Sequence, residues 1–291
     1  MLLLDGKVAS LALKEKLKQQ VQDAVTDYGR APHLAAILVG NNGASETYVA
    51  SKIKNCEETG FKSTLIRLPE DVDEETLVES INSLNEDPLV DGILVQLPLP
   101  SQINENRIIS LINPAKDVDG FHPYNAGMLM LGQKGFVPAT PQGIMYLLEH
   151  FKIETAGKHA VVIGRSNIVG RPVSVLLSTN NNPGNCTVTV THSRTKDLFS
   201  ICRTADIIVA AIGIPGFVKA DMVKPGAVVI DVGISRVPDA SKRSGFAIKG
   251  DVEFESVSAV AGAISPVPGG VGLMTIAALL QNTFDAYLNN N

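Results

Sequence analysis

The sequence predicts an α/β protein built from two domains, each with a parallel sheet covered by helices. The chain has 291 residues, a length that suits two domains of about 100 to 200 residues each. Short apolar strand-like segments alternate with longer helix-like segments in two blocks, and a loop-rich stretch separates the blocks. Because repeated β-α-β order builds parallel sheets, the fold class follows from this alternation.

The first block supplies three strands and three helices. Ser45 is the expected N-cap of the helix that carries Tyr48, and Gly60 is its expected stop. In chain order we predict a helix at 7–28, a strand LAAILVG, a helix at 45–59, a strand STLIRL, a helix at 73–86 and a strand DGILVQL.

The second block begins after a long loop, NPAKDVDGFHPYNAGMLMLGQKG. Thr140 is expected as an N-cap with Pro141 at the first helical position, so the domain boundary is placed there. The segments HAVVIG, CTVTVTHS, ADIIVAAIG and GAVVIDVG then read as strands, and a last helix runs from about residue 272 to the C-terminus.

Composition favours a cytoplasmic protein that acts on small molecules. Hydrophobic residues make up 45% and charged residues 19% of the chain, and its net charge is −5. That balance argues against a nucleic-acid or anionic-membrane partner. No run approaches the ~18 apolar residues of a membrane span. The opening MLLLDGK lacks the basic leader and long apolar core of a signal peptide, so export is not expected.

Cysteine and histidine spacing predicts neither disulfides nor a metal site. Cys56, Cys186 and Cys202 form no C-x-x-C pair, as expected of reduced thiols. The five histidines are scattered without metal-ligand spacing.

A turn in the second block has the form of a nucleotide site. In HAVVIGRSNIVGRP, a strand turns tightly at Gly164 and a helix begins near Gly170, so backbone N–H groups at the helix start would face an anion. The spacing is not G-x-G-x-x-G, so a plain strand-helix turn explains these residues equally well.

The next strand favours NADP over NAD. A NAD site typically has an acidic residue near this strand end, whereas here the strand ends in THSRTK, with Ser193 and Arg194. Arg165 supplies a second cation for an additional phosphate. Both arginines are also compatible with simple solvation at the surface.

Tyr48 and Lys52 are spaced to lie on one helix face close to the end of a strand. The Y-x-x-x-K pair suggests a short-chain dehydrogenase, but here it precedes the nucleotide turn by more than a hundred residues. We therefore expect the pair to bind or activate substrate. A packed tyrosine beside a solvated lysine is the plainer alternative.

Three further segments support a substrate site. Gln96 ends the strand in DGILVQLPLP, and a neutral amide can hold a lysine without stabilising its charge. KDVDGFHP offers Asp117 and Asp119 without the spacing of a calcium loop. SPVPGGVGLMT is a proline-glycine loop where backbone can approach a ligand closely, although it also reads as a simple turn.

These residues together resemble the bifunctional methylenetetrahydrofolate dehydrogenase/methenyltetrahydrofolate cyclohydrolase family. The resemblance spans nearly the whole chain, with the motifs GASETYVASKIKNCEETG, ILVQLPLP, KDVDGFHPYNAG, PATPQGI, VVIGRSNIVGRP and PVPGGVG in the family's order. It implies a folate-binding catalytic domain at 1–139 completed by the C-terminal helix at 272–291, a Rossmann-like NADP-binding domain at 140–271, and a cleft between them. It also implies tetrahydrofolate derivatives as substrates and a homodimer.

The resemblance also implies roles for individual residues. Lys52 would be the acid/base of the hydrolytic step, Gln96 its neutral partner, Tyr48 a platform for the aminobenzoyl ring and Asp119 a partner of the pterin. Further folate contacts would come from Leu97, Pro268, Gly269 and Gly272, and the NADP site would comprise Gly164, Arg165, Ser166, Gly170, Ser193 and Ile234.

One position departs from the family's pattern. Leu273 stands where the family usually has the proline of PGGVGPMT. If that proline opened the helix, its absence would cost about 0.4 to 1 kcal/mol locally. A dehydrogenase without useful cyclohydrolase activity and a non-catalytic folate or NADP binding module are alternatives within the same fold.

Overall fold

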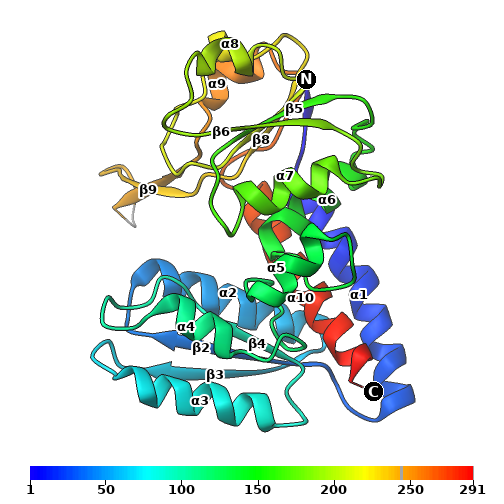
Figure 1. Ribbon diagram of the computed structural model, residues 1–291, viewed down its shortest axis with the longest axis vertical. Helices are drawn as coiled ribbons and strands as arrows, with labels where there is room; N and C mark the ends of the chain where they lie inside the picture. The colour runs from blue at the N-terminus through cyan, green and yellow to red at the C-terminus, as the bar shows by residue number, and fades with distance from the viewer. Residues whose placement is uncertain (243–244, 291) are drawn as a thin grey trace. The chain divides into compact units, whose positions relative to one another are not determined.

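The computed structural model describes residues 1–242 and 245–290 and divides into two compact units. The six-stranded unit comprises Met1–Leu11 and Thr140–Thr275, and the three-stranded unit comprises Ala12–Ala139 and the chain from Ile276 onward (Figure 1). Helices α1 (Gly6–Tyr28) and α10 (Val271–Asn289) contribute residues to both units. Asn291, included in the predicted last helix, lies outside the described residues. None of the described helices is long and apolar enough to cross a membrane.

The three-stranded unit has a parallel sheet in the order β3-β2-β4. Helix α2 lies on one face, and α3 lies on the other (Figure 1). The elements besides α1 and α10 are β2 (His33–Val39), α2 (Gly43–Thr59), β3 (Lys62–Leu68), α3 (Glu74–Glu86), β4 (Gly92–Val95), α4 (Glu105–Leu111) and α5 (Pro123–Met130).

Strand β2 is the centre of this unit because every one of its residues is buried. A continuous apolar run is expected of a parallel strand that is covered on both faces. Alternate residues Ala35, Ile37 and Val39 pack in one core cluster with Leu77 and Ile81 of α3. This packing fixes the carboxyl ends of β2 and β4, where the next segments begin.

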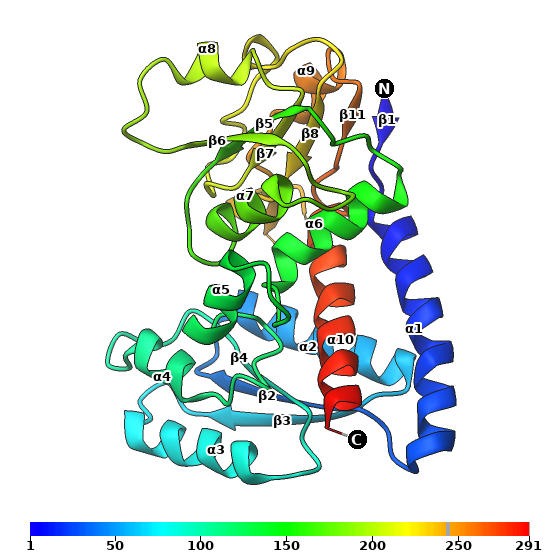
Figure 2. The ribbon, with the colours of Figure 1, turned by 45° about the vertical axis from the view of Figure 1, so that its right-hand side comes forward.

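The six-stranded unit has a second parallel sheet in the order β1-β11-β8-β7-β5-β6. Helices α8 and α9 lie on one side of this sheet and α6 and α7 on the other (Figure 2). Its elements are β1 (Leu2–Leu3), α6 (Ala139–His150), β5 (His159–Ile163), α7 (Gly170–Ser178), β6 (Thr187–Thr191), α8 (Leu198–Cys202), β7 (Ile207–Ala210), the 3₁₀ turn η1 (Ala220–Met222), β8 (Val228–Asp231), the antiparallel pair β9 (Ser235–Pro238) and β10 (Phe246–Lys249), α9 (Phe254–Ser258) and β11 (Ala263–Ile264).

The predicted α/β class with parallel sheets is confirmed, but two predicted helix caps are wrong. Helix α2 begins at Gly43, and the Asn42 side chain accepts a hydrogen bond from the Ser45 N–H at 3.3 Å, so Asn42 rather than Ser45 is the cap. Helix α6 begins at Ala139, so Thr140 already lies in its first turn. The Thr140 hydroxyl instead contacts the Thr275 hydroxyl at 3.0 Å. The cap of α2 therefore lies three residues before the predicted one, and α6 begins two residues before the predicted Pro141.

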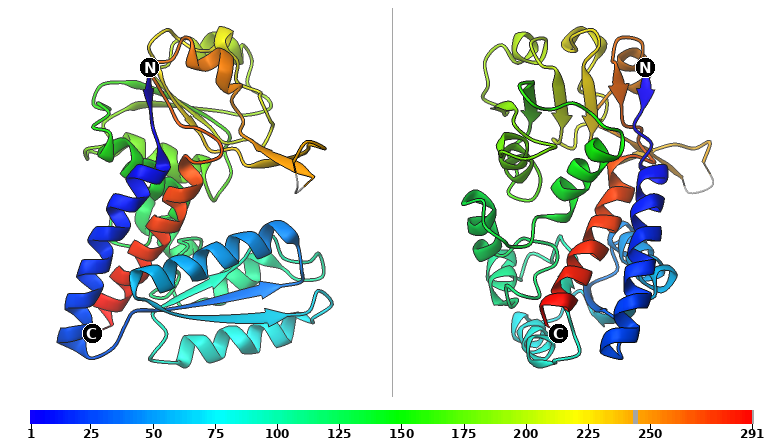
Figure 3. Two further views of the ribbon diagram at one scale, coloured as in Figure 1. Left: turned by 180° about the vertical axis from the view of Figure 1, so that it is seen from behind. Right: turned by 90° about the vertical axis from the view of Figure 1, so that its right-hand side faces the viewer.

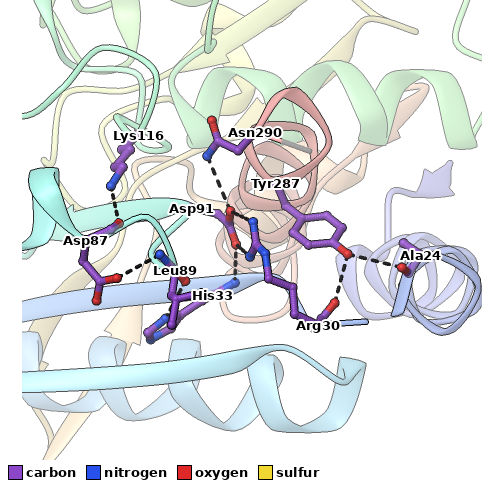
Figure 4. Close-up of polar contacts among 9 residues, drawn as sticks. All are labelled: Ala24, Arg30, His33, Asp87, Leu89, Asp91, Lys116, Tyr287 and Asn290. Carbon is purple, nitrogen blue, oxygen red and sulfur yellow. Dashed lines mark hydrogen bonds and ion pairs between the residues drawn. The ribbon is translucent and has the colours of Figure 1, made fainter. Parts of the chain in front are cut away.

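A buried ion pair fastens the C-terminal helix to the three-stranded unit. Arg30 donates two hydrogen bonds to the Asp91 carboxylate at 2.7 and 2.8 Å, and the Asp91 side chain is fully buried (Figure 4). The backbone N–H of His33 donates to the same carboxylate at 2.9 Å. Arg30 also lies 4.6 Å from the ring centroid of Tyr287, whose hydroxyl donates to the Arg30 carbonyl at 2.9 Å.

This contact explains how α10 is held in the unit. Its C-terminal half runs beside α1 (Figure 3), and the Tyr287 hydroxyl lies 3.3 Å from the Ala24 carbonyl of α1. The Tyr287 ring is fully buried here, and its hydroxyl still finds backbone carbonyl acceptors. The end of the chain thus closes the unit that begins near its start.

Replacing Asp91 by Ala is expected to lower the free energy of unfolding by about 1–3 kcal/mol, because it leaves the buried His33 N–H and the partly buried Arg30 guanidinium without their acceptor. Urea denaturation followed by circular dichroism measures the loss. The control is Glu46→Ala, which removes the bidentate partner of the half-exposed Arg67 and should have a much smaller effect, since water and salt screen that pair. Equal effects of the two substitutions would contradict the account.

Candidate active site

Lys52 lies at the carboxyl edge of the three-stranded sheet, where α2 follows β2 and Gln96 follows β4. Only 8% of Lys52 is exposed, and its ammonium nitrogen donates to the Gln96 side-chain oxygen at 3.2 Å. Tyr48, one helical turn earlier, is partly buried. The sequence spacing alone could not bring Gln96 to Lys52, because the two residues are 44 positions apart.

The orientation of Gln96 is fixed by neighbouring backbone. Its side-chain N–H donates to the Leu97 carbonyl at 2.7 Å, and its own backbone N–H donates to the Ile37 carbonyl at 2.9 Å. With the amide nitrogen engaged there, the amide oxygen faces Lys52. A neutral acceptor therefore holds the amine, as the sequence suggested.

Burial dominates the electrostatics of this site. Desolvation lowers the pKa of Lys52, while the nearby Asp119 carboxylate and the Cys56 thiol act in the opposite direction. The pKa of Asp119 is raised by its own burial and lowered by Lys52. Both shifts favour neutral forms, so the site can hold a lysine that releases or accepts a proton closer to neutral pH than a solvated lysine.

Cys56 is a further neighbour of Lys52. From the sequence, only its reduced state was predicted. It lies one turn further along α2, is fully buried, and its pKa is raised by burial to about 12. The thiol therefore stays neutral next to the amine. The i, i+4 spacing from Lys52 was the available indication.

Asp117 organises the loop that carries Asp119. Its buried carboxylate accepts hydrogen bonds from the backbone N–H groups of Phe121 at 3.1 Å and His122 at 2.8 Å. The side-chain amide of Asn125 donates to it at 2.8 Å. Desolvation raises the pKa of Asp117 to about 6 despite these donors. One carboxylate of the KDVD segment thus shapes the loop, while the other lies near Lys52.

The turn after β5 in the six-stranded unit leaves no room for side chains at its two glycines. A Cβ on Gly164, whose φ is +117°, would lie 2.2 Å from the Ala211 carbonyl oxygen, and one on Gly170 would lie 2.3 Å from the Gly164 oxygen. The Ser166 hydroxyl accepts from the Val169 N–H at 3.2 Å and the Gly170 N–H at 3.3 Å. The chain therefore turns tightly into α7, as an anion-binding helix start requires.

The other predicted cofactor residues lie on the same sheet edge. Arg165 and Ser166 follow β5, Ser193 follows β6, and Ile234 follows β8, all in one parallel sheet. Arg165, Ser166 and Ser193 are exposed, and Ile234 is 42% exposed. A polar, cationic edge with tight glycine turns fits a phosphorylated dinucleotide.

The proline-glycine loop lies in the six-stranded unit, next to Ile234. Gly269 has a φ of +106°, and a Cβ on Gly272 would lie 3.1 Å from the end of the Ile234 side chain. Pro268 follows a cis peptide bond. Of the predicted folate residues, Tyr48, Lys52, Gln96, Leu97 and Asp119 belong to the three-stranded unit, whereas Pro268, Gly269 and Gly272 belong to the six-stranded unit.

Leu273 is not the first residue of the last helix. Helix α10 begins at Val271, and the Leu273 N–H donates to the Gly270 carbonyl at 3.2 Å. A proline there would lack this donor, so leucine gains a weak hydrogen bond in exchange for its greater freedom in the unfolded chain.

In the part of the chain that the structure describes, no group of three or more His, Cys, Asp and Glu side chains is placed to hold a metal ion.

Sequence comparisons decide the family. The profile described as "Tetrahydrofolate dehydrogenase/cyclohydrolase, catalytic domain" matches residues 4–119, and the profile of the same family's "NAD(P)-binding domain" matches residues 138–291. The chain belongs to the tetrahydrofolate dehydrogenase/cyclohydrolase family. The predicted resemblance is thereby confirmed.

Members of the tetrahydrofolate dehydrogenase/cyclohydrolase family match along nearly their full length. The "Bifunctional protein FolD" of Flavobacterium johnsoniae is 60% identical over 283 residues, covering 97% of this chain and 96% of the relative. A crystal structure of the bifunctional FolD enzyme from Campylobacter jejuni superposes with a TM-score of 0.93 at 50% identity and covers all of both chains. The Trypanosoma brucei enzyme, solved with NADP and an inhibitor, gives a TM-score of 0.93 at 40% identity over 98% of this chain and 96% of that one.

The raised pKa of Asp117 predicts a pH-dependent stability. Because its pKa of about 6 in the folded protein exceeds the ordinary aspartate value of 3.8, the stability it contributes is full below pH ~4 and is lost as pH rises through ~6. The loss amounts to roughly 3 kcal/mol for a shift of about two units. Urea unfolding of wild type and Asp117→Asn from pH 4 to 7 measures it. The wild type should lose stability relative to the variant across this window, and a constant difference would refute the assignment.

Proposed function

We propose that the chain carries out two successive reactions at one carbon of a reduced folate. It oxidises methylenetetrahydrofolate to methenyltetrahydrofolate with NADP⁺ and then hydrolyses the methenyl product to formyltetrahydrofolate, as part of one-carbon metabolism. Family membership supports both activities, since its profiles cover a catalytic and an NAD(P)-binding domain. The single structural observation that carries the proposal is the buried Lys52 amine held by the neutral Gln96.

Lys52 serves the hydrolytic step in this proposal. Water adds to the methenyl carbon and loses one proton, which leaves a hydroxyl on that carbon. The hydroxyl then loses its proton as the formyl C=O forms and the bond from this carbon to one ring nitrogen breaks, and that nitrogen gains a proton. One proton is released overall. A group that accepts and returns a proton near neutral pH assists both transfers. Burial, which lowers the pKa of Lys52, makes the amine suited to this task.

The other residues of the three-stranded unit position the folate. Tyr48 stacks on the aminobenzoyl ring, Asp119 holds the amino group of the pterin, and Leu97 contributes an apolar contact. Asp119 suits this role because its carboxyl oxygens can accept from an amino group and Asp117 fixes its loop. Pro268, Gly269 and Gly272 complete the folate contacts from the proline-glycine loop.

The six-stranded unit binds NADP, which accepts the hydride from the methylene carbon when bound. The turn with Gly164, Ser166 and Gly170 receives the pyrophosphate, since neither glycine has room for a side chain. Arg165 and Ser193 bind the additional phosphate, and Ile234 lines the same site. We assign NADP rather than NAD because β6 ends at Thr191 and is followed by His192, Ser193 and Arg194 instead of an acidic residue.

We also propose the domain boundaries, the oligomeric state and the cellular location of the protein. Residues 1–139 with the C-terminal helix 272–291 form the folate-binding domain, and 140–271 form the NADP-binding domain. The functional protein is a cytoplasmic homodimer without nucleic-acid or membrane partners. Sedimentation at equilibrium measures its mass, and a monomer at working concentration would contradict the dimer.

Replacing Lys52 by Met is expected to reduce hydrolysis of supplied methenyltetrahydrofolate by at least about 100-fold, the contribution of one acid/base group. The loss of methenyl absorbance measures this step, and NADPH formation from methylenetetrahydrofolate measures the oxidation. The control is Lys54→Met two residues further along α2, where the side chain is 74% exposed.

Wild type and Lys54→Met should hydrolyse the methenyl compound equally. Full hydrolysis by Lys52→Met would remove its proposed role. No absorbance change by the wild type with either NADP⁺ or NAD⁺ would refute the proposed function as a whole.

A further inference from the structure

Two short segments interlock at the carboxyl edge of the six-stranded sheet, where the proposed NADP site lies. The first, residues 231–233, runs from the last residue of β8 into the turn before Ile234. The second, residues 250–251, follows β10. Each segment places an aspartate against a glycine of the other, although they are separated by the β9-β10 hairpin.

Asp231 ties the two segments together. One oxygen of its buried carboxylate accepts from the backbone N–H groups of Gly233 at 3.0 Å and Asp251 at 2.8 Å, and the other accepts from Val252 at 3.0 Å. Its own N–H donates to the Ser265 hydroxyl at 2.8 Å. Asp231 therefore links the turn after β8 to the segment that leads into the proline-glycine loop.

Asp251 holds the turn after the neighbouring strand β7. A single oxygen of its fully buried carboxylate accepts from the backbone N–H groups of Ile212 at 2.7 Å and Gly213 at 3.0 Å. The other oxygen has no hydrogen-bond partner among the described residues. Both bonds fix backbone at the edge where parallel sheets bind their ligands.

The two glycines are needed for this fit. A Cβ on Gly233 would lie 2.3 Å from the unpartnered oxygen of Asp251, and one on Gly250 would lie 1.9 Å from an oxygen of Asp231. Any side chain at either position would displace a carboxylate. The Asp251 side chain thus holds the turn at Ile212 and Gly213 by hydrogen bonds and lies directly against Gly233 in the turn that carries Ile234.

We propose that Asp251 is a positioning residue for NADP binding, which holds the turns after β7 and β8 in the geometry that receives the cofactor. This inference rests on the proposed function. Among the described residues no lysine, arginine or histidine forms an ion pair with Asp251. Its contribution is therefore hydrogen-bond geometry, and a neutral amide with its oxygen in the same place should replace it.

The test compares Asp251→Ala with Asp251→Asn in steady-state assays and direct NADP⁺ titration. Asp251→Ala should raise the KM and Kd for NADP⁺ about tenfold, because loosely held binding groups lose affinity. Hydrolysis of supplied methenyltetrahydrofolate, which needs no hydride transfer, should stay within about twofold of wild type. Asp251→Asn should restore NADP⁺ affinity, since its amide oxygen can accept both backbone N–H groups.

Asp206 supplies a matched control at the opposite end of β7. Its carboxylate also accepts a backbone hydrogen bond, from the His159 N–H at 3.0 Å, but it precedes the strand. Asp206→Ala should lower the thermal midpoint without changing the KM for NADP⁺. An equal rise in KM in this variant would show a merely structural effect and overturn the proposal.

A second substitution keeps the test decisive if Asp251→Ala does not fold. Gly233→Ala keeps the Asp251 side chain but displaces its carboxylate, and it should raise the KM for NADP⁺ in the same selective way. Unchanged NADP⁺ affinity in the folded variants, or an Asn variant as impaired as the Ala variant, would overturn the positioning role. Failure of the proposed function differs, because the wild type itself would then not reduce NADP⁺ with methylenetetrahydrofolate.

Discussion

The proposed chemistry of this protein depends on keeping the Lys52 ammonium group buried beside a neutral hydrogen-bond acceptor. Lys52 donates to a neutral amide oxygen, and its nearest carboxylate influence comes from Asp119. A full ion pair would stabilise the charged amine and raise its pKa, whereas burial alone lowers it. The surrounding fold can be understood as the means of holding Lys52, Gln96 and Asp119 in this balance.

Buried aspartates stabilise several loops near the proposed functional groups. Buried carboxylates accept backbone N–H groups and thereby fix irregular chain: Asp117 does so in the loop that carries Asp119, and Asp231 and Asp251 do so at the edge proposed to bind the cofactor. Asp91 similarly binds a backbone N–H, but it also pairs with Arg30. Because buried backbone donors must be satisfied, these aspartates determine loop shape without entering the chemistry themselves.

Sequence patterns predicted the parallel sheets because short apolar strands such as β2 and β5 alternate with longer helix-like segments. They also predicted that Lys52 and Gln96 would face one edge, because parallel strands end together. Helix caps were less accurate: Ser45 looked like a cap, yet the Asn42 side-chain oxygen accepts a backbone hydrogen bond at the true start of the helix. A local pattern cannot decide between two good capping residues three positions apart.

Long-range contacts were beyond the sequence. The two-residue strand β1 pairs with β11, and such a short segment has no periodicity to detect. The contacts among Asp231, Gly233, Gly250 and Asp251 likewise cross a hairpin. Segments of the form D-x-G and G-D are common in sequences. Only the fold shows that Gly233 makes room for Asp251 and that Gly250 makes room for Asp231.

The most direct measurement of the central claim is the titration of Lys52 by NMR, with ¹³C at the lysine ε carbon and Lys52→Met to assign its signal. The account predicts that the Lys52 resonance titrates below the ordinary lysine pKa of about 10.4, and that Gln96→Glu, by placing a carboxylate beside the amine, moves the titration upward. A wild-type Lys52 that titrates at or above the ordinary value would contradict the account.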